Sequence, residues 1–282
     1  MSLQARESSS KKGLLLVTFG TSYPKAKVAF DNIDHKVNKV WPDTEVRWAY
    51  TSTFIREKLA KRGEHIPSPA EALARMSEEG FSHVVVQSLH IIPGSEFHDL
   101  IQTVNAFRGL PEGIRHLSIG TPLLNHHQDL EAMSEIMAGR FSQISEKEAL
   151  VLMGHGSTHG ANAYYPAFQY YLDEVPGNYY MGTVEGFPGL ARVVNRLKEA
   201  DIQKVYLTPF MSVAGDHAQN DMSGKGSESW KSRLESEGFR FDMGPSFMSM
   251  TYELDELFQS IGEKNPIQLE ELEPLYQVFF EG

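Results

Sequence analysis

The chain of 282 residues contains no cysteine. This absence excludes disulfides, thiolate nucleophiles, cysteine-bound iron–sulfur clusters and cysteine-type zinc sites. Any metal site must therefore be built mainly from histidine and carboxylate side chains, which suit Zn(II), Co(II), Ni(II) and Fe(II). Apolar runs are short, and none approaches the ~20 residues that a membrane span requires. The polar start of the chain has no apolar stretch of the kind found in secretory signals, so we expect a flexible leader over residues 1–11 and a cytoplasmic protein.

Positive charge is also scarce. The chain has 26 lysines and arginines against 37 aspartates and glutamates, a formal net charge of −11. That balance argues against a nucleic-acid-binding protein, and it means that an anionic ligand would need a locally positive pocket. Hydrophobic residues make up 41% of the chain, which is enough for a packed globular core. The length suits one large α/β domain or two of about 140 residues.

Strand-like and helix-like segments alternate in the first half. Residues 13–20 and 83–90 are apolar runs that predict buried strands, and residues 45–51 predict a further strand between them. Helical spacing covers residues 25–40, and a second helix is predicted from Ser68 to Gly80. Ser68 is its expected N-cap, Glu71 completes a capping box and Gly80 ends the helix. This order favours a mostly parallel sheet with helices on both faces.

The second half repeats the same plan. Residues 149–156, 179–184 and 204–210 predict strands, and residues 163–175 and 189–200 predict helices. Gly20 and Gly156 occupy corresponding places at the end of the first strand of each half. We therefore predict two similar α/β domains, one over residues 12–125 and one over residues 126–282.

The two halves differ where their strands end. His155 stands where the first half has Phe19, and Glu185 and His217 also fall in loops that follow predicted strands. Ligands bind at the carboxyl ends of strands in open α/β sheets. Two imidazoles and one carboxylate form a minimal ligand set for a first-row metal ion. Taken singly, each residue is more often a surface or helix-capping residue; their coincidence favours a shared metal site.

Other catalytic motifs are missing. The glycines at 154, 156 and 160 miss the dinucleotide fingerprint by one residue, and there is no phosphate-loop lysine. The chain also has no Gly-x-Ser-x-Gly elbow and no His-Glu-x-x-His helix. Nucleotide-dependent and serine-hydrolase chemistry are therefore not predicted.

Five segments together resemble one family, the anaerobic cobalt chelatases of cobalamin synthesis. They are Val17-Thr-Phe-Gly-Thr-Ser22, Gln87-Ser-Leu-His-Ile-Ile-Pro-Gly94, Met153-Gly-His-Gly-Ser157, Thr183-Val-Glu-Gly-Phe187 and Pro209-Phe-Met-Ser-Val-Ala-Gly-Asp-His217. The resemblance extends over nearly the whole chain, from Lys12 to Phe247. It implies an ATP-independent class II chelatase with a two-domain, ferrochelatase-like fold. Such enzymes insert Co(II) into sirohydrochlorin or its reduced precorrin form, without a nucleotide.

The resemblance also implies roles for residues. It places the family's metal-binding and catalytic trio on His155, Glu185 and His217, with His155 also accepting a proton. Further residues are candidates to contact the tetrapyrrole: Phe19, Thr21, Ser22, Leu89, His90, Ser157 and Phe210. Because the tetrapyrrole bears many carboxylates, Lys25, Lys27 and Arg56 are candidate donors to it. A purely structural role is at least as plausible for each of these contact residues, and for His90 the two interpretations are balanced.

Three alternatives stay open at this point. The same histidine and carboxylate ligands accept Fe(II) or Ni(II), so an iron or nickel chelatase is a close rival. A non-catalytic carrier of metal or tetrapyrrole is a rival from another class. The apolar residues between 252 and 280 either pack back onto their own domain or form an interface, and a homo-oligomer is a weaker expectation.

Overall fold

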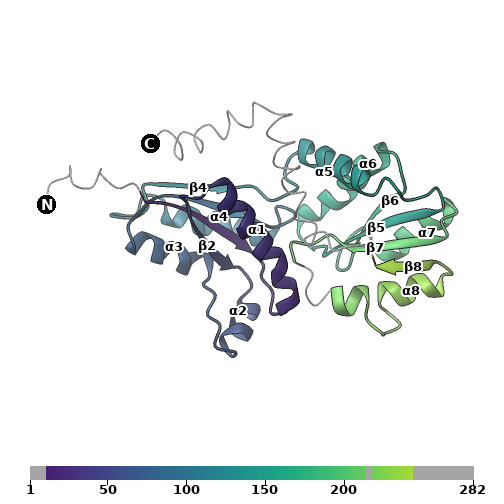
Figure 1. Cartoon of the computed structure of the whole chain (residues 1–282), viewed down its shortest axis with the longest axis horizontal. Helices are drawn as coiled ribbons and strands as arrows, with labels where there is room; N and C mark the ends of the chain where they lie inside the picture. The colour runs from purple at the N-terminus through teal and green to yellow at the C-terminus, as the bar shows by residue number, and fades with distance from the viewer. Residues whose placement is uncertain (1–10, 214–217, 244–282) are drawn as a thin grey trace.

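The computed structural model describes residues 11–213 and 218–243, which form two four-stranded parallel sheets (Figure 1). Sheet A has the order β2-β1-β3-β4, with β1 (Lys11–Thr18), β2 (Glu45–Tyr50), β3 (Phe81–Ser88) and β4 (His116–Gly120). Sheet B has the order β6-β5-β7-β8, with β5 (Glu148–Gly154), β6 (Tyr179–Thr183), β7 (Lys204–Pro209) and β8 (Arg240–Met243). The predicted fold class, two similar parallel α/β units, is confirmed.

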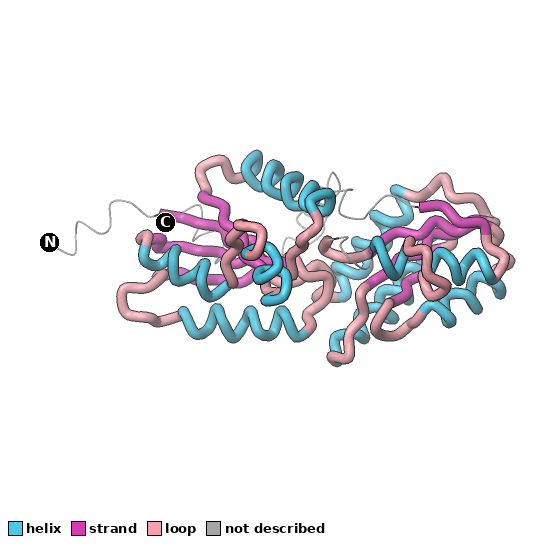
Figure 2. The backbone as a smooth tube through the Cα atoms, turned by 90° about the horizontal axis from the view of Figure 1, so that it is seen from below, coloured by secondary structure: helices cyan, strands magenta, loops and turns pink. Residues whose placement is uncertain are grey.

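Helices cover both faces of sheet A, as Figure 2 shows. On one face, Leu14 and Leu16 of β1 share a core cluster with Ala29 and Ile33 of α1 (Val28–Val40). The opposite face packs against α3 (Pro69–Glu78) and α4 (Ser95–Phe107). Since alternate side chains of a strand point to opposite faces, a strand buried on both sides needs an unbroken apolar run, which β1 has. Helix α2 (Thr53–Ala60) follows β2 directly.

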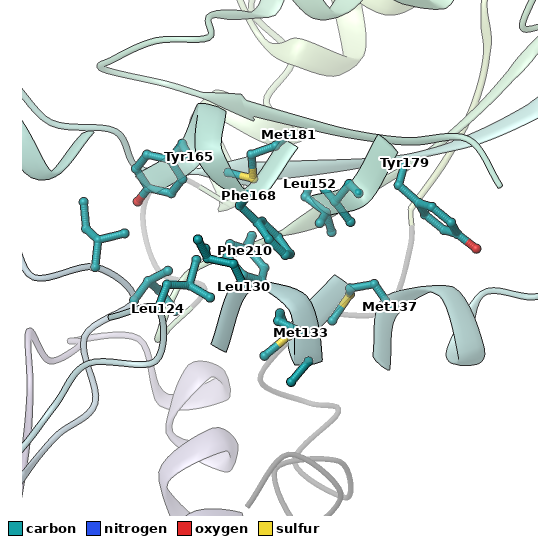
Figure 3. Close-up of a cluster of buried hydrophobic side chains, with 14 of the residues drawn as sticks. Leu124, Leu130, Met133, Met137, Leu152, Tyr165, Phe168, Tyr179, Met181 and Phe210 are labelled. Carbon is teal, nitrogen blue, oxygen red and sulfur yellow. The ribbon is translucent and has the colours of Figure 1, made fainter. Parts of the chain in front are cut away.

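Sheet B is layered in the same way. One face packs against α5 (His127–Arg140) and α6 (Tyr164–Glu174), and Figure 3 shows the side chains of this layer. The other face packs against α7 (Leu190–Glu199) and α8 (Trp230–Ser236). Short helical turns occupy Pro24–Lys27, Gly160–Ala163 and Ala218–Met222. The repeated strand order agrees with the predicted correspondence of the halves, as do the positive φ angles of Gly20 (98°) and Gly156 (84°).

Two local predictions need correction. The helix predicted from residue 25 begins at Val28, because residues 24–27 form a tighter 3₁₀ turn. The capping box of α3 is only half made: Ser68 Oγ accepts from the Glu71 N–H at 3.2 Å, but the Glu71 carboxylate turns away to Arg75 and His65. A charged arginine and a histidine on the same face attract the carboxylate more strongly than a neutral backbone N–H does.

The two halves share parts of their cores. One cluster contains Leu14 and Leu16 of the first half together with Leu150 and Leu152 of the second. Val213, which follows β7, packs with Phe30, Tyr50 and Leu59 of the first half. The domain boundary at residues 125 and 126 stays a prediction, and most of the predicted leader lies outside the described residues. In the described part of the chain, no helix combines the length and the apolar character needed to cross a membrane.

Candidate active site

His155 and Glu185 lie side by side beyond the carboxyl ends of β5 and β6. The Glu185 N–H donates to the His155 carbonyl at 2.8 Å, and the Val184 N–H donates to the Gly154 carbonyl at 3.0 Å. These bonds continue the parallel pairing of the two strands into the loops. The His155 side chain is half-buried and Glu185 is exposed. Two of the three predicted ligands therefore come from paired positions on one edge of sheet B.

Glycine at 156 and 186 lets the two loops approach so closely. Gly156 has a φ of +84°, and a Cβ placed there would lie 2.5 Å from the Gly186 nitrogen. A Cβ on Gly186 would lie 2.2 Å from Asn162 Oδ1 and 3.0 Å from the Ser157 nitrogen. Any larger residue at either position must push the loops apart, so these glycines determine how near His155 comes to Glu185.

The peptide of Gly156 orients the imidazole of His155. The His155 Nδ1–H donates to the Gly156 carbonyl at 2.9 Å. Because a carbonyl only accepts, this bond assigns the proton of the neutral ring to Nδ1 and the lone pair to Nε2. On its other side, the Gly156 N–H interacts with the hydroxyl of the buried Tyr165, whose pKa burial raises to about 12. His155 is thus held in the tautomer that a proton acceptor or metal ligand requires.

Asn162 ties the two loops to each other. Its Oδ1 accepts from the Ser157 N–H at 3.0 Å, and its Nδ2 donates to the Phe187 carbonyl at 2.8 Å. Sequence reasoning singled out neither Asn162 nor Tyr165 as a site residue. The available signal was slight: an asparagine just after a glycine-rich loop carries both the donors and the acceptor needed to bridge two backbones.

The third predicted ligand, His217, lies outside the described residues. Within residues 11–213 and 218–243, no group of three histidine, aspartate or glutamate side chains is arranged to hold a metal ion. The trio of His155, Glu185 and His217 therefore stays a prediction, of which the structure places two members together.

The predicted contact residues of the first half gather beyond β1. Phe19 is 41% exposed, whereas Thr21 and Ser22 are buried. The Ser22 carbonyl accepts from Arg62 Nη1 at 2.7 Å. Leu89, just beyond β3, is half-buried against the shared core cluster. Only Phe19 among these four side chains offers a large exposed surface.

His90 is a buried, neutral histidine. It is 8% exposed, and burial lowers its pKa from 6.5 to about 4. Its Nδ1 is bonded to Ser88 Oγ at 2.9 Å, and its Nε2 has no hydrogen-bond partner. This geometry fits a structural histidine of the core, and it equally fits a histidine whose Nε2 contacts a ligand.

The remaining two contact predictions belong to the second half. Ser157 Oγ accepts from the His159 N–H at 3.0 Å, which shapes the loop that follows His155. Phe210 is completely buried and stacks on Phe168, with ring centroids 5.1 Å apart (Figure 3). Phe210 thus packs behind the loops, within the core, and does not present its ring at a surface.

The carboxyl edges of the two sheets face each other. His98 of α4, in the first half, contacts His159 of the His155 loop edge-on, with ring centroids 4.9 Å apart. The segment after β7 also reaches the first half through Val213. These contacts join the first half to the loop after β5 and to the segment after β7, and ligands bind at such strand ends in open α/β sheets.

Comparison with known proteins decides the family. The sequence pattern described as cobalt chelatase (CbiK) matches residues 12–268. This chain belongs to the cobalt chelatase family. Among its relatives, the sirohydrochlorin cobaltochelatase CbiKC of Nitratidesulfovibrio vulgaris is 38% identical over 236 residues, 82% of each chain. The sirohydrochlorin cobaltochelatase of Salmonella typhimurium is 34% identical over 233 residues, which is 81% of this chain and 86% of the relative.

Solved structures agree with the cobalt chelatase fold. SirB from Bacillus subtilis with Fe³⁺ superposes with a TM-score of 0.55 at 14% identity, covering 84% of this chain and 88% of SirB. DR2241 from Deinococcus radiodurans, described as structurally similar to chelatases, also reaches 0.55 at 13% identity, over 85% of this chain and 52% of DR2241. At such low identity these two structures show the shared fold alone.

Proposed function

We propose that this cobalt chelatase inserts Co(II) into sirohydrochlorin, or its reduced precorrin-type form, in anaerobic cobalamin synthesis and without ATP. The observation that carries the proposal is the family match over residues 12–268, supported by two relatives that are named sirohydrochlorin cobaltochelatases. The pairing of His155 with Glu185 at the edge of sheet B supplies groups suited to this chemistry.

Metal insertion requires that two pyrrole N–H protons leave the ring and that the metal ion loses water. A neutral imidazole with its proton on Nδ1 leaves Nε2 unprotonated, which suits it to accept a proton near pH 7. We assign this role to His155, because its Nδ1–H is engaged by the Gly156 carbonyl. Glu185 supplies a carboxylate next to it, and His217 is the proposed third ligand of the substrate metal.

A site of this kind must release its metal to the ring. Two imidazoles and one carboxylate hold a divalent first-row ion with positions left for substrate. A four-thiolate cage, which this chain without cysteine does not build, would retain the metal more firmly. The exposure of Glu185 is compatible with such exchange.

An absorbance time course tests the proposal. Wild-type protein is mixed with sirohydrochlorin and Co(II) in the absence of ATP, in parallel with His155→Ala. We expect catalytic spectral conversion by the wild type, and loss of most of the accelerated rate in the variant while sirohydrochlorin still binds. An unchanged rate in His155→Ala would remove His155 from the mechanism.

The same assay separates the rival functions. Fe(II) and Ni(II) in place of Co(II) identify an iron or nickel chelatase by a higher kcat/KM for that metal. Stoichiometric binding without acceleration identifies a carrier. A cytoplasmic location and a homo-oligomer stay predictions.

A further inference from the structure

A seam in the first half contains buried polar atoms without partners. We call the contact between residues 19–23 and α2, including Thr51 and Ser52 just before it, the α2 seam. Ser22 Oγ, Thr51 Oγ1 and Arg56 Nε are buried there and have no hydrogen-bond partner. Ser22 is only 3% exposed. Buried polar atoms in folded proteins are nearly always bonded to protein, water or ligand, so these three atoms are available to bond to water or to a ligand.

Several contacts hold the two sides of the α2 seam together. The Ser52 N–H donates to the Phe19 carbonyl at 3.3 Å, and Arg62 Nη1 donates to the Ser22 carbonyl at 2.7 Å. Lys58 Nζ lies 5.5 Å from the centre of the Tyr23 ring. The unpartnered atoms therefore belong to two neighbouring backbone segments, and these contacts hold the two segments in place relative to each other.

The α2 seam is positively charged. In the part of the chain that the structure describes, Arg56, Lys58 and Arg62 contact no carboxylate, whereas nearby Lys27 is paired with Glu64. Arg56 Nη2 donates to Thr53 Oγ1 at 3.0 Å, which folds its guanidinium over the first turn of α2. The N-terminal end of a helix carries partial positive charge and unbonded N–H groups. These donors are suited to an anion.

Aromatic side chains border the same seam. Phe19 is 41% exposed and Phe54 is 70% exposed. Phe54 also lies 6.0 Å from Lys58 Nζ, measured to the ring centre. Exposed aromatic surface next to unpaired cations suits a ligand that is flat and apolar with acidic arms at its edge.

We propose that the α2 seam binds a carboxylate side chain of the tetrapyrrole, with Arg56, Ser22 and Thr51 as its donors. This inference rests on the proposed function. It gives the first half a defined role, because the loops of sheet A hold the substrate by an acidic arm while the loops of sheet B present His155 and Glu185.

Equilibrium binding without metal tests the inference. Sirohydrochlorin and its methyl esters, which lack the negative charges, are titrated into the wild type, Arg56→Gln and Ser22→Ala. The matched control is Arg75→Gln, an exposed arginine of α3 paired with Glu71. Because a hydrogen bond to a charged group contributes about 1.5–3 kcal/mol, we expect Arg56→Gln to weaken binding of the acid at least about tenfold. Binding of the ester should be equal in Arg56→Gln and the wild type.

Each outcome is decisive. Equal affinity of Arg56→Gln and Arg75→Gln for the acid, or an equal loss for acid and ester, would overturn the carboxylate assignment. A seam that binds inorganic phosphate but does not distinguish acid from ester would be an anion site unrelated to the ring, which also overturns it. Cobalt insertion by the wild type is measured in parallel: if the wild type inserts cobalt, a negative binding result refutes the seam alone, and if it neither binds nor metallates the ring, both proposals fail.

Discussion

At the scale of single residues, the site depends on groups that do not touch a metal or substrate. The Tyr165 hydroxyl interacts with the N–H of Gly156, and the carbonyl of that same glycine accepts from His155. The hydroxyl therefore acts on the imidazole through the backbone of Gly156. Residues that orient a ligand in this way commonly change activity by 10–100-fold when replaced.

Tyr165→Phe tests this arrangement because it removes one oxygen and keeps the ring. We expect kcat for cobalt insertion to fall about tenfold with little change in KM for sirohydrochlorin, since no binding group is lost. Tyr179→Phe is the matched control: that hydroxyl donates to the Ala138 carbonyl at 3.4 Å in the same core cluster. Equal kinetics in the two variants would show that the Tyr165 hydroxyl does not position His155.

His90 gives a residue-scale prediction about pH. Its pKa is about 4 in the folded chain against about 6.5 when unfolded. Between these values the unfolded state binds more protons, so stability falls as pH falls from 6.5 towards 4. Buried His90 should therefore cost on the order of 2 kcal/mol of stability at pH 5 relative to pH 7.

Urea unfolding at pH 7 and pH 5 checks this cost. In His90→Leu the drop in unfolding free energy between the two pH values should be smaller than in the wild type by about 2 kcal/mol. His35→Leu, at an exposed position of α1, should keep the wild-type drop. A His90→Leu protein with the full wild-type pH dependence would show that His90 titrates normally.

At the scale of elements, the loops after β5 and β6 work as one unit. Gly156 and Gly186 lie against each other, and Asn162 bonds to both loops. Gly156→Ala should separate the loops, because its Cβ would lie 2.5 Å from the Gly186 nitrogen at an unfavourable φ. We expect a loss of about 1–3 kcal/mol in stability and at least a tenfold lower insertion rate.

Gly160→Ala is the control within the same loop. A Cβ at Gly160 meets nothing within 4 Å, so stability and insertion rate should stay near wild type. Thermal unfolding and the absorbance assay measure both quantities. If Gly156→Ala is as active as Gly160→Ala, the close approach of the loops is not needed for the reaction.

At the scale of the whole molecule, Val213 links the halves. It packs with Phe30, Tyr50 and Leu59 and lies four positions before His217. Val213→Ala should reduce the free energy of unfolding by about 1–2 kcal/mol and lower the insertion rate, because the end of the segment after β7 loses its packing against the first half. Val40→Ala, on the exposed end of α1, should change neither. A Val213→Ala enzyme with full activity would show that this contact serves stability alone.

Much of this architecture could be predicted from the sequence. The strands β1 and β5 are buried on both faces and β3 and β7 largely so, and their apolar runs were visible without the structure. The edge strands β4 and β8 were missed because they are short and mix polar with apolar residues. The positions of His155 and Glu185 at neighbouring strand ends could be predicted, because the order of strands and loops is visible in the sequence. Tyr165 and Asn162 could not, because their roles depend on loop contacts that form only when distant segments pack.

The matching order of the two sheets has a consequence for how such an enzyme can change over generations. The same α/β arrangement occurs in both halves, yet the proposed metal ligands lie in the second half and the proposed substrate-binding α2 seam lies in the first. Substitutions in the loops of sheet A can then alter which tetrapyrrole is bound, while the loops of sheet B that carry the proposed metal ligands stay unchanged. A new substrate preference becomes accessible by small steps, since no single mutation has to serve both purposes.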